Sequence, residues 1–368
     1  MHPPQRSPLP RILHTADWQL GLKLRFVEGD RGARAREERF EVLGRLAALA
    51  HEHQVDAVLV AGDVFDDNGV GPRTLLRTRE ALAAFAPIPV LLLPGNHDPA
   101  RSDCALARLD AAEHVHVLLD SAPVQLDGLT VYPCPLVRRH QQEDPCRDLP
   151  GRQDGESVRI ALAHGGVRQF SERTEAPNVI DAAAVIDKGF DYLALGDWHG
   201  VYEVSARAWY SGTPEPTRFK EKLPGLALLV DIPATGVLPT VTRLPVARTR
   251  WLRHTAALQD SADLDQLQQW LQDLPTASLT LVELTLSGAV SLAGKVRLDK
   301  LLADWGQALM FLRVRDDDLQ QLPSDADLAT LPTHGFVGRA VELLRQSEHP
   351  ADADALRLLY RLVQEARP

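Results

Sequence analysis

The chain has 368 residues, a formal net charge of −10 and an apolar fraction of 45%, which allows a sizeable core and predicts two or three domains. A small DNA-binding module would be basic, so any nucleic-acid contact must use local patches. The three cysteines have no metal-binding or redox spacing, and no apolar run approaches the length of a membrane span. We therefore expect a soluble, cytoplasmic protein with free thiols and no membrane contact.

The first part of the chain alternates strands with helices. After a Pro-rich tail at 1–10, which we expect to be disordered, apolar runs predict strands at 11–15, 57–61 and 88–93. Apolar residues at helical spacing predict one helix from about 31 onward and another at 73–86. This order implies parallel strands joined by right-handed crossovers.

The pattern then changes to short strands. We predict a short helix near 103–112, a hairpin that turns at Asp127-Gly128 and an exposed loop at 138–157. Two strands, one ending at His164 and one leading to Asp197, flank a polar segment at 168–188. Further strands are predicted at 208–210, 226–231 and 241–244, and the first domain ends near 247.

The remainder of the chain predicts a smaller unit and a helical end. Residues 248–316 contain two helices, 261–273 and 295–305, and two strands, 279–286 and 308–314. An acidic linker at 317–335 precedes a helical segment at 336–368, whose two short apolar stripes must pack on the body of the chain or on a partner. The stripes are Val337, Ala340, Val341 and Leu344, then Leu356, Leu359, Tyr360 and Val363.

Five of the apolar runs end in residues that can hold a metal. Gly62 lets the chain turn after strand 57–61 and delivers Asp63 to the carboxyl edge of the sheet, where open α/β sheets bind ligands. Carboxylate, amide and imidazole donors together suit divalent metals such as Mn, Fe or Zn. The donors on the other four runs are Asp17 and Gln19; Asn96 and His97; His164; and Asp197 and His199.

The stretches HTADWQLG, AGDVFD, LLPGNHDP, AHGG, GDWHG and YSGTPE resemble, in this order, the calcineurin-like metallophosphoesterases, and among them the SbcD-type DNA-repair exonuclease subunits. The resemblance covers 11–220 well and 248–316 only by position and size. It implies an α/β (α+β) fold: a metallophosphoesterase β-sandwich flanked by helices at 11–247, a small α+β capping domain at 248–316 and C-terminal helices.

The resemblance also implies an activity and partners. The chain would be a metal-dependent DNA nuclease, exonuclease or endonuclease, that acts in DNA repair or phage defence. Its partner would be an SMC-like, SbcC-type ATPase bound through the helices at 336–368, and the complex would contain a homodimer of this chain.

The same resemblance assigns roles to the strand-end residues. Asp63 would bridge two divalent metals, with Mn expected and Mg, Fe or Zn as alternatives. Asp17, Gln19 and His199 would complete one metal site, and Asn96, His164 and Asp197 the other. His97 would give a proton to the leaving 3′ oxygen. Asp66 and Asp98 are expected to orient ligands or brace turns.

Two positions depart from the family's pattern and leave alternatives open. The family has His where this chain has Gln19, and GHxH where residues 196–199 read GDWH. An amide is a poorer ligand than imidazole, so Gln19 is either a ligand or a packed polar residue. The alternatives to a DNA nuclease are a small-molecule phosphodiesterase and a catalytically weakened scaffold.

The basic residues near Asp17 also have two interpretations. The arginines from Arg31 to Arg39 are most simply a solvated helix face. The alternative is a patch that tracks the DNA backbone, formed by Lys23, Arg25, Arg31 and Arg34.

Overall fold

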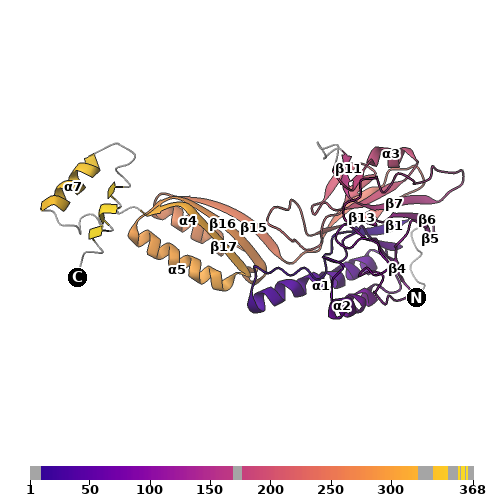
Figure 1. Cartoon of the computed structure of the whole chain (residues 1–368), viewed down its shortest axis with the longest axis horizontal. Helices are drawn as coiled ribbons and strands as arrows, with labels where there is room; N and C mark the ends of the chain where they lie inside the picture. The colour runs from indigo at the N-terminus through magenta and orange to yellow at the C-terminus, as the bar shows by residue number, and fades with distance from the viewer. Residues whose placement is uncertain are drawn as a thin grey trace. The chain divides into compact units, whose positions relative to one another are not determined.

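The computed structural model describes residues 10–168, 176–321, 335–346, 355–356, 358–360 and 362–363. The chain divides into two compact units, Met1–Thr249 and Arg250–Pro368 (Figure 1). Apart from Pro10, the predicted tail lies outside the described residues.

The first unit contains two six-stranded sheets packed face to face. One has the order β14 (Thr240–Pro245), β13 (Leu226–Asp231), β1 (Arg11–Thr15), β2 (Ala57–Val60), β3 (Val90–Leu92) and β4 (Val115–Val117). The other has the order β11 (Tyr202–Ser205), β12 (Ala208–Tyr210), β10 (Tyr192–Gly196), β7 (Val158–His164), β6 (Leu129–Cys134) and β5 (Val124–Leu126). A separate pair is formed by β8 (Gly166–Val167) and β9 (Val179–Ile180).

Helices cover both outer faces of this sandwich. On one side lie α1 (Gly29–Glu52), α2 (Pro72–Leu82) and the 3₁₀ turn η1 (Ala83–Phe85), and on the other lies α3 (Ala182–Asp187) (Figure 1). Successive side chains of a strand point to opposite faces, so Leu13 packs toward α1 while Ile12 packs between the sheets. The predicted β-sandwich flanked by helices is confirmed.

One predicted helix is wrong. Residues 103–108 form turns and 109–112 have no regular structure, although Cys104, Ala105, Leu106 and Leu109 are buried in the core. The backbone N–H of Ala105 donates to Oδ1 of Asn68 at 2.8 Å instead of to a carbonyl within a helix. A tertiary hydrogen bond therefore replaces the local one that the apolar spacing suggested.

The second unit is built on a three-stranded parallel sheet, β15 (Arg250–Leu258), β16 (Thr280–Val290) and β17 (Phe311–Gln321). Helices α4 (Ser261–Gln272) and α5 (Leu292–Ala308) pack on it, with a 3₁₀ turn, η3 (Ala277–Leu279), before β16. Sequence patterns missed β15. They also ended β17 too early, so residues 317–321 belong to a strand and not to the predicted linker.

The C-terminal helical segment is described in part. Helix α7 (Gly335–Gln346) places Val341 in an apolar cluster with Val337, and the second predicted stripe contributes Leu356, Leu359, Tyr360 and Val363. The two stripes thus contact each other. Within the described ranges, no helix combines the length and the apolar composition needed to cross a membrane.

Candidate metal centre

The predicted donors gather at the carboxyl ends of five strands. β1, β2 and β3 are parallel to one another in the first sheet, and β7 and β10 are parallel in the second. Parallel strands bring the residues at their carboxyl ends to the same edge of the sheet, so donors far apart in sequence meet at one end of the sandwich.

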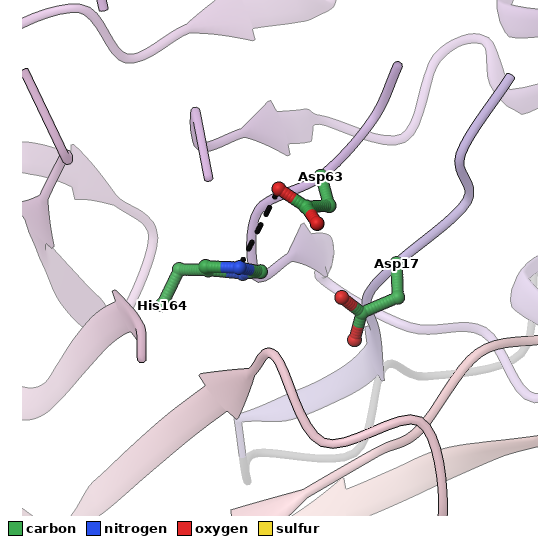
Figure 2. A group of neighbouring side chains, drawn as sticks. All are labelled: Asp17, Asp63 and His164. Atoms are coloured by element: carbon green, nitrogen blue, oxygen red, sulfur yellow. Dashed lines mark ion pairs between the residues drawn. The ribbon is translucent and has the colours of Figure 1, made fainter. Parts of the chain in front are cut away.

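Three of these side chains form a compact group of potential metal ligands. Asp17, Asp63 and His164 each offer one ligand atom, and these atoms all lie within 4.8 Å of one another. Figure 2 shows the three side chains pointing toward one another from separate segments, with His164 Nε2 3.4 Å from Asp63 Oδ1. All three are almost completely buried.

The loops after β1 and β2 are hydrogen-bonded to each other. The N–H of Asp17 donates to the carbonyl of Gly62 at 3.0 Å, and that of Gln19 donates to the carbonyl of Asp63 at 2.9 Å. Asp17, Gln19, Asp63 and Asp197 all have positive φ, between 45° and 100°, which non-glycine residues rarely adopt. Strained backbone of this kind concentrates at functional sites.

Close packing explains the glycine before Asp63. Gly62 has φ +87°, and a Cβ at this position would lie 2.2 Å from Nδ1 of His164. A side chain here would therefore displace the imidazole from the group.

Three histidines present Nε2 to the site because Nδ1 of each ring is held by another group. Nδ1 of His164 contacts the carbonyl of Ala61 at 2.8 Å, and Nδ1 of His97 contacts the carbonyl of Asp66 at 2.8 Å. Nδ1 of His199 contacts Oε1 of Glu221 at 2.6 Å. Carbonyl and carboxylate oxygens only accept, so Nδ1 carries the hydrogen and Nε2 is the atom presented to the site.

The remaining predicted ligands lie around these ring nitrogens. Nε2 of His164 lies 3.1 Å from Oδ1 of Asn96 and 3.8 Å from Oδ1 of Asp197. Nε2 of His199 lies 4.0 Å from Oδ1 of Asp17 and 3.2 Å from the amide nitrogen of Gln19. Each predicted ligand therefore lies beside at least one other.

The electrostatics of the group fit a bound cation. Burial, together with the charges of Asp63 and Asp197, raises the pKa of Asp17 to about 6 against the opposing effect of the histidines. Burial lowers the pKa of His164, but the charges of Asp63, Asp17 and Asp197 outweigh it and raise that pKa to about 9. Buried oxygen and imidazole donors with excess negative charge are what divalent metals bind.

His97 is separate from this group but adjacent to it. Its backbone N–H donates to Oδ1 of Asp63 at 2.9 Å, and its Nε2 lies 4.0 Å from Oδ2 of the same carboxylate. The side chain is 24% exposed and lines a cavity beside the group.

The two supporting aspartates differ in their contacts. Asp98 is fully buried and accepts backbone hydrogen bonds from Gly95 at 2.7 Å and Phe65 at 3.0 Å, which join the loops after β2 and β3. Burial and the charge of Asp63 raise the pKa of Asp98 to about 7. Asp66 holds His97 through its backbone carbonyl, and burial raises the pKa of its own carboxyl group.

Sequence reasoning missed the residues that support His199. Glu221 accepts from His199, and it also accepts from the backbone N–H of Thr217 at 2.8 Å and from the Thr217 hydroxyl. Both residues lie in TRFKEK, one residue after the YSGTPE stretch. A carboxylate in an otherwise basic hexapeptide is the signal that could have identified Glu221.

The predicted solvated face of α1 is wrong in part. Arg39 is 2% exposed, and its guanidinium donates to the carbonyls of Trp18, Glu215 and Pro216. It therefore ties α1 to the segments after β1 and β12. Arg34 is more exposed but is paired with Glu38 and Glu41, which reduces its charge available to DNA.

Comparison with known proteins places the first unit in a wider group. Residues 10–230 match the family model described as calcineurin-like phosphoesterase. The D subunit of the nuclease SbcCD of Bacillus subtilis (strain 168) is 29% identical over 254 residues, which are 57% of this chain and 63% of that protein. The chain thus spans less than two thirds of the length of this relative.

Two solved structures are also similar. TT1561 of Thermus thermophilus has 12% identity and a TM-score of 0.42, covering 65% of this chain and 99% of that one. A dimetal phosphatase from Danio rerio has 13% identity and a TM-score of 0.38, covering 65% and 100%.

Proposed function

We propose, from the premise that this chain belongs to the calcineurin-like phosphoesterase family, that it is a nuclease that hydrolyses phosphodiester bonds of DNA with two divalent metals. The observation that carries the proposal is the convergence of Asp17, Asp63 and His164, whose ligand atoms lie within 4.8 Å of one another. Buried negative charge of this density is stabilised by cations and suits a reaction on an anionic phosphate.

The donors divide into two sets that share Asp63. Asp17, Gln19 and His199 would hold one metal, and Asn96, His164 and Asp197 the other. Mn is the metal we expect, because the set is rich in oxygen donors, with Mg, Fe or Zn as alternatives. The chemistry that such a pair supplies is neutralisation of the phosphate and activation of water.

His97 is our candidate for the proton donor. Its Nδ1 is held by the carbonyl of Asp66, so its Nε2 is the atom that gains or loses a proton. That atom lies 4.0 Å from Oδ2 of Asp63, within reach of a leaving oxygen at the same site.

The choice of DNA as substrate rests on the resemblance to SbcD-type subunits, with which the named relative agrees. From the same resemblance we propose that the protein acts in DNA repair or phage defence in the cytoplasm. It would act as a homodimer within a complex with an SMC-like ATPase. The apolar residues left exposed on the C-terminal segment support such a docking role, and Phe336 is 85% and Leu343 65% exposed. Lys23, Arg25 and Arg31 are proposed minor contributors to DNA contact.

Mn²⁺-dependent degradation of linear DNA, measured beside metal content, tests the proposal. Asp63→Ala should lose both metal and activity, whereas His97→Ala should keep its metal and lose roughly 100-fold or more in rate. His140→Ala removes an exposed loop histidine and serves as the matched control.

The same assay separates the alternatives. A wild-type protein that hydrolyses bis(p-nitrophenyl) phosphate but no DNA would support a small-molecule phosphodiesterase. Failure on both substrates with the metals bound would support a scaffold. A His97→Ala protein at full speed would refute the proton-donor assignment.

A further inference from the structure

A cavity of about 450 Å³ opens beside the candidate metal centre, within the first unit. Asp63, Asn96 and His97 line it on the side of the proposed chemistry. The rest of its lining includes one large aromatic side chain and three basic ones, none of which the proposed hydrolysis uses: Trp198, Arg218, Lys220 and Lys222.

Trp198 is an unusual residue to expose at this position. It lies between two proposed ligands, Asp197 and His199, yet its side chain lines the cavity and is 46% exposed. Leaving an indole in contact with water forgoes the free energy that its burial would contribute. An exposed aromatic face beside a reaction site is a surface on which a planar group can stack.

The three basic residues come from one short segment that turns at 219–220. Arg218, Lys220 and Lys222 alternate with Phe219 and Glu221, and Glu221 is directed to His199, 2.6 Å from its Nδ1. All three side chains are exposed and line the cavity, so the cations face it together. They form a local positive region in a chain whose net charge is −10.

We propose that this cavity is a nucleotide subsite, in which Trp198 stacks on the base next to the scissile phosphate and the three cations hold the flanking phosphates. The inference rests on the proposed nuclease function and specifies its substrate. A base inside a duplex is already stacked and paired, so Trp198 can take only a terminal or unpaired base. The preferred substrate is therefore single-stranded DNA or a frayed end.

Removing the base without removing the phosphate tests the stacking directly. We would use single-stranded oligonucleotides in which an abasic analogue replaces each position near the cleaved end in turn. With the wild type, the abasic analogue at one of these positions should lower kcat/KM by about 5- to 150-fold. This is the range expected for the loss of one base stacked on one aromatic ring. Trp198→Ala should lower the rate on the parent oligonucleotide by a similar factor and show no further loss with the abasic one.

Two more variants separate stacking from a structural role. Trp198→Phe keeps an aromatic face and should retain most of the discrimination between base and abasic site. Tyr202→Ala removes another aromatic side chain, which is 40% exposed and lies outside the cavity lining. It should leave the ratio of kcat/KM between the parent and the abasic oligonucleotide unchanged. Discrimination that survives in Trp198→Ala, or is absent from the wild type at every position, would overturn the proposal.

A binding measurement keeps this result independent of hydrolysis. Fluorescence anisotropy measures the Kd of the same oligonucleotides with the metal chelated. The Kd of the abasic oligonucleotide should exceed that of the parent oligonucleotide by the same factor as the loss in kcat/KM. If the wild type bound with this discrimination but cleaved no DNA, the proposed nuclease function would fail while the nucleotide subsite stood.

Discussion

Oε1 of Glu221 lies 2.6 Å from Nδ1 of His199, and the two side chains are only 6% and 11% exposed. Burial lowers the pKa of His199, but the hydrogen bond that its Nδ1 donates to Glu221 and the charge of Asp17 outweigh it, so the pKa lies above its ordinary value. The contact fixes the ring and directs its Nε2 toward Gln19 and Asp17.

Replacement of Glu221 should weaken metal binding. Glu221→Ala removes the charged acceptor of His199 Nδ1 and leaves only the Thr217 hydroxyl, 3.0 Å away. It should lower metal affinity or activity by about 10- to 100-fold, whereas Glu221→Gln should be milder because its amide oxygen can still accept. Titration of the metal-free protein with Mn²⁺ measures this. Glu203→Ala, at an exposed carboxylate, is the control, and a Glu221→Ala protein that matches it would contradict the role.

Gly95→Ala should damage the site without unfolding the chain. A Cβ there would lie 2.2 Å from Oδ1 and 2.5 Å from the backbone nitrogen of Asp63, so this residue has to move. A displacement of about 1 Å can cost on the order of 100-fold in rate. Gly71→Ala has no atom within 4 Å of the new Cβ and should be tolerated. Circular dichroism reports on the fold, and the nuclease rate reports on the site. Equal rates in the two variants would contradict the close contact between Gly95 and Asp63.

Asp197→His restores the family's usual donor and should shift metal preference toward softer ions such as Zn²⁺. Asp197 adds one carboxylate to the set, and its Oδ1 lies 3.8 Å from Nε2 of His164. Removing that negative charge should also increase attraction for phosphate. Activity profiles with Mn²⁺, Mg²⁺ and Zn²⁺ measure the shift. Loss of all metal from the variant, with the wild type fully loaded, would mean that Asp197 has another role.

His14 should make the fold sensitive to acid. Its burial between the sheets, beside the hydroxyl of Tyr192 at 3.0 Å, lowers its pKa from 6.5 to about 3, against a smaller opposing effect of the Leu195 carbonyl. The unfolded chain therefore binds the extra proton first, and stability present above pH 6.5 is lost as pH falls toward 3. The loss at pH 5 should be about 2 kcal/mol.

Urea unfolding at about pH 7 and pH 5 isolates this contribution when wild type and His14→Gln are compared. The glutamine cannot take up the proton, so the difference in unfolding free energy between the two pH values should be smaller in the variant. An unchanged difference would show that other groups dominate the acid response.

Truncation after Asp325 should leave the proposed nuclease activity intact and abolish binding of the proposed partner. The described apolar cluster of the C-terminal segment is made by its own two stripes, so the first unit does not need it to fold. The shortened protein should keep its melting temperature and the proposed activity on short DNA, and lose co-purification with the proposed SMC-like ATPase. Aggregation or a much lower melting temperature would assign the stripes to the core instead.

The sequence by itself determined the five strands of the site and the candidate donor residues that follow them. β1, β2, β3, β7 and β10 are buried apolar runs, and such runs are visible locally because β-sheet burial requires nearly every residue to be apolar. The donors at their ends could be grouped in advance because parallel strands share a carboxyl edge. The family resemblance rested on those same short stretches.

Only the tertiary structure decided which distant side chains support the site. Burial of Arg39, the contact of Glu221 with His199 and the opening of a cavity beside Trp198 each depend on segments brought together from different parts of the chain. The same holds for residues 103–112, where Asn68 takes the hydrogen bond that a helix would have formed. Periodicity records the environment of a residue along its own strand or helix, whereas the partner of a buried polar group is chosen by the packing of the whole domain.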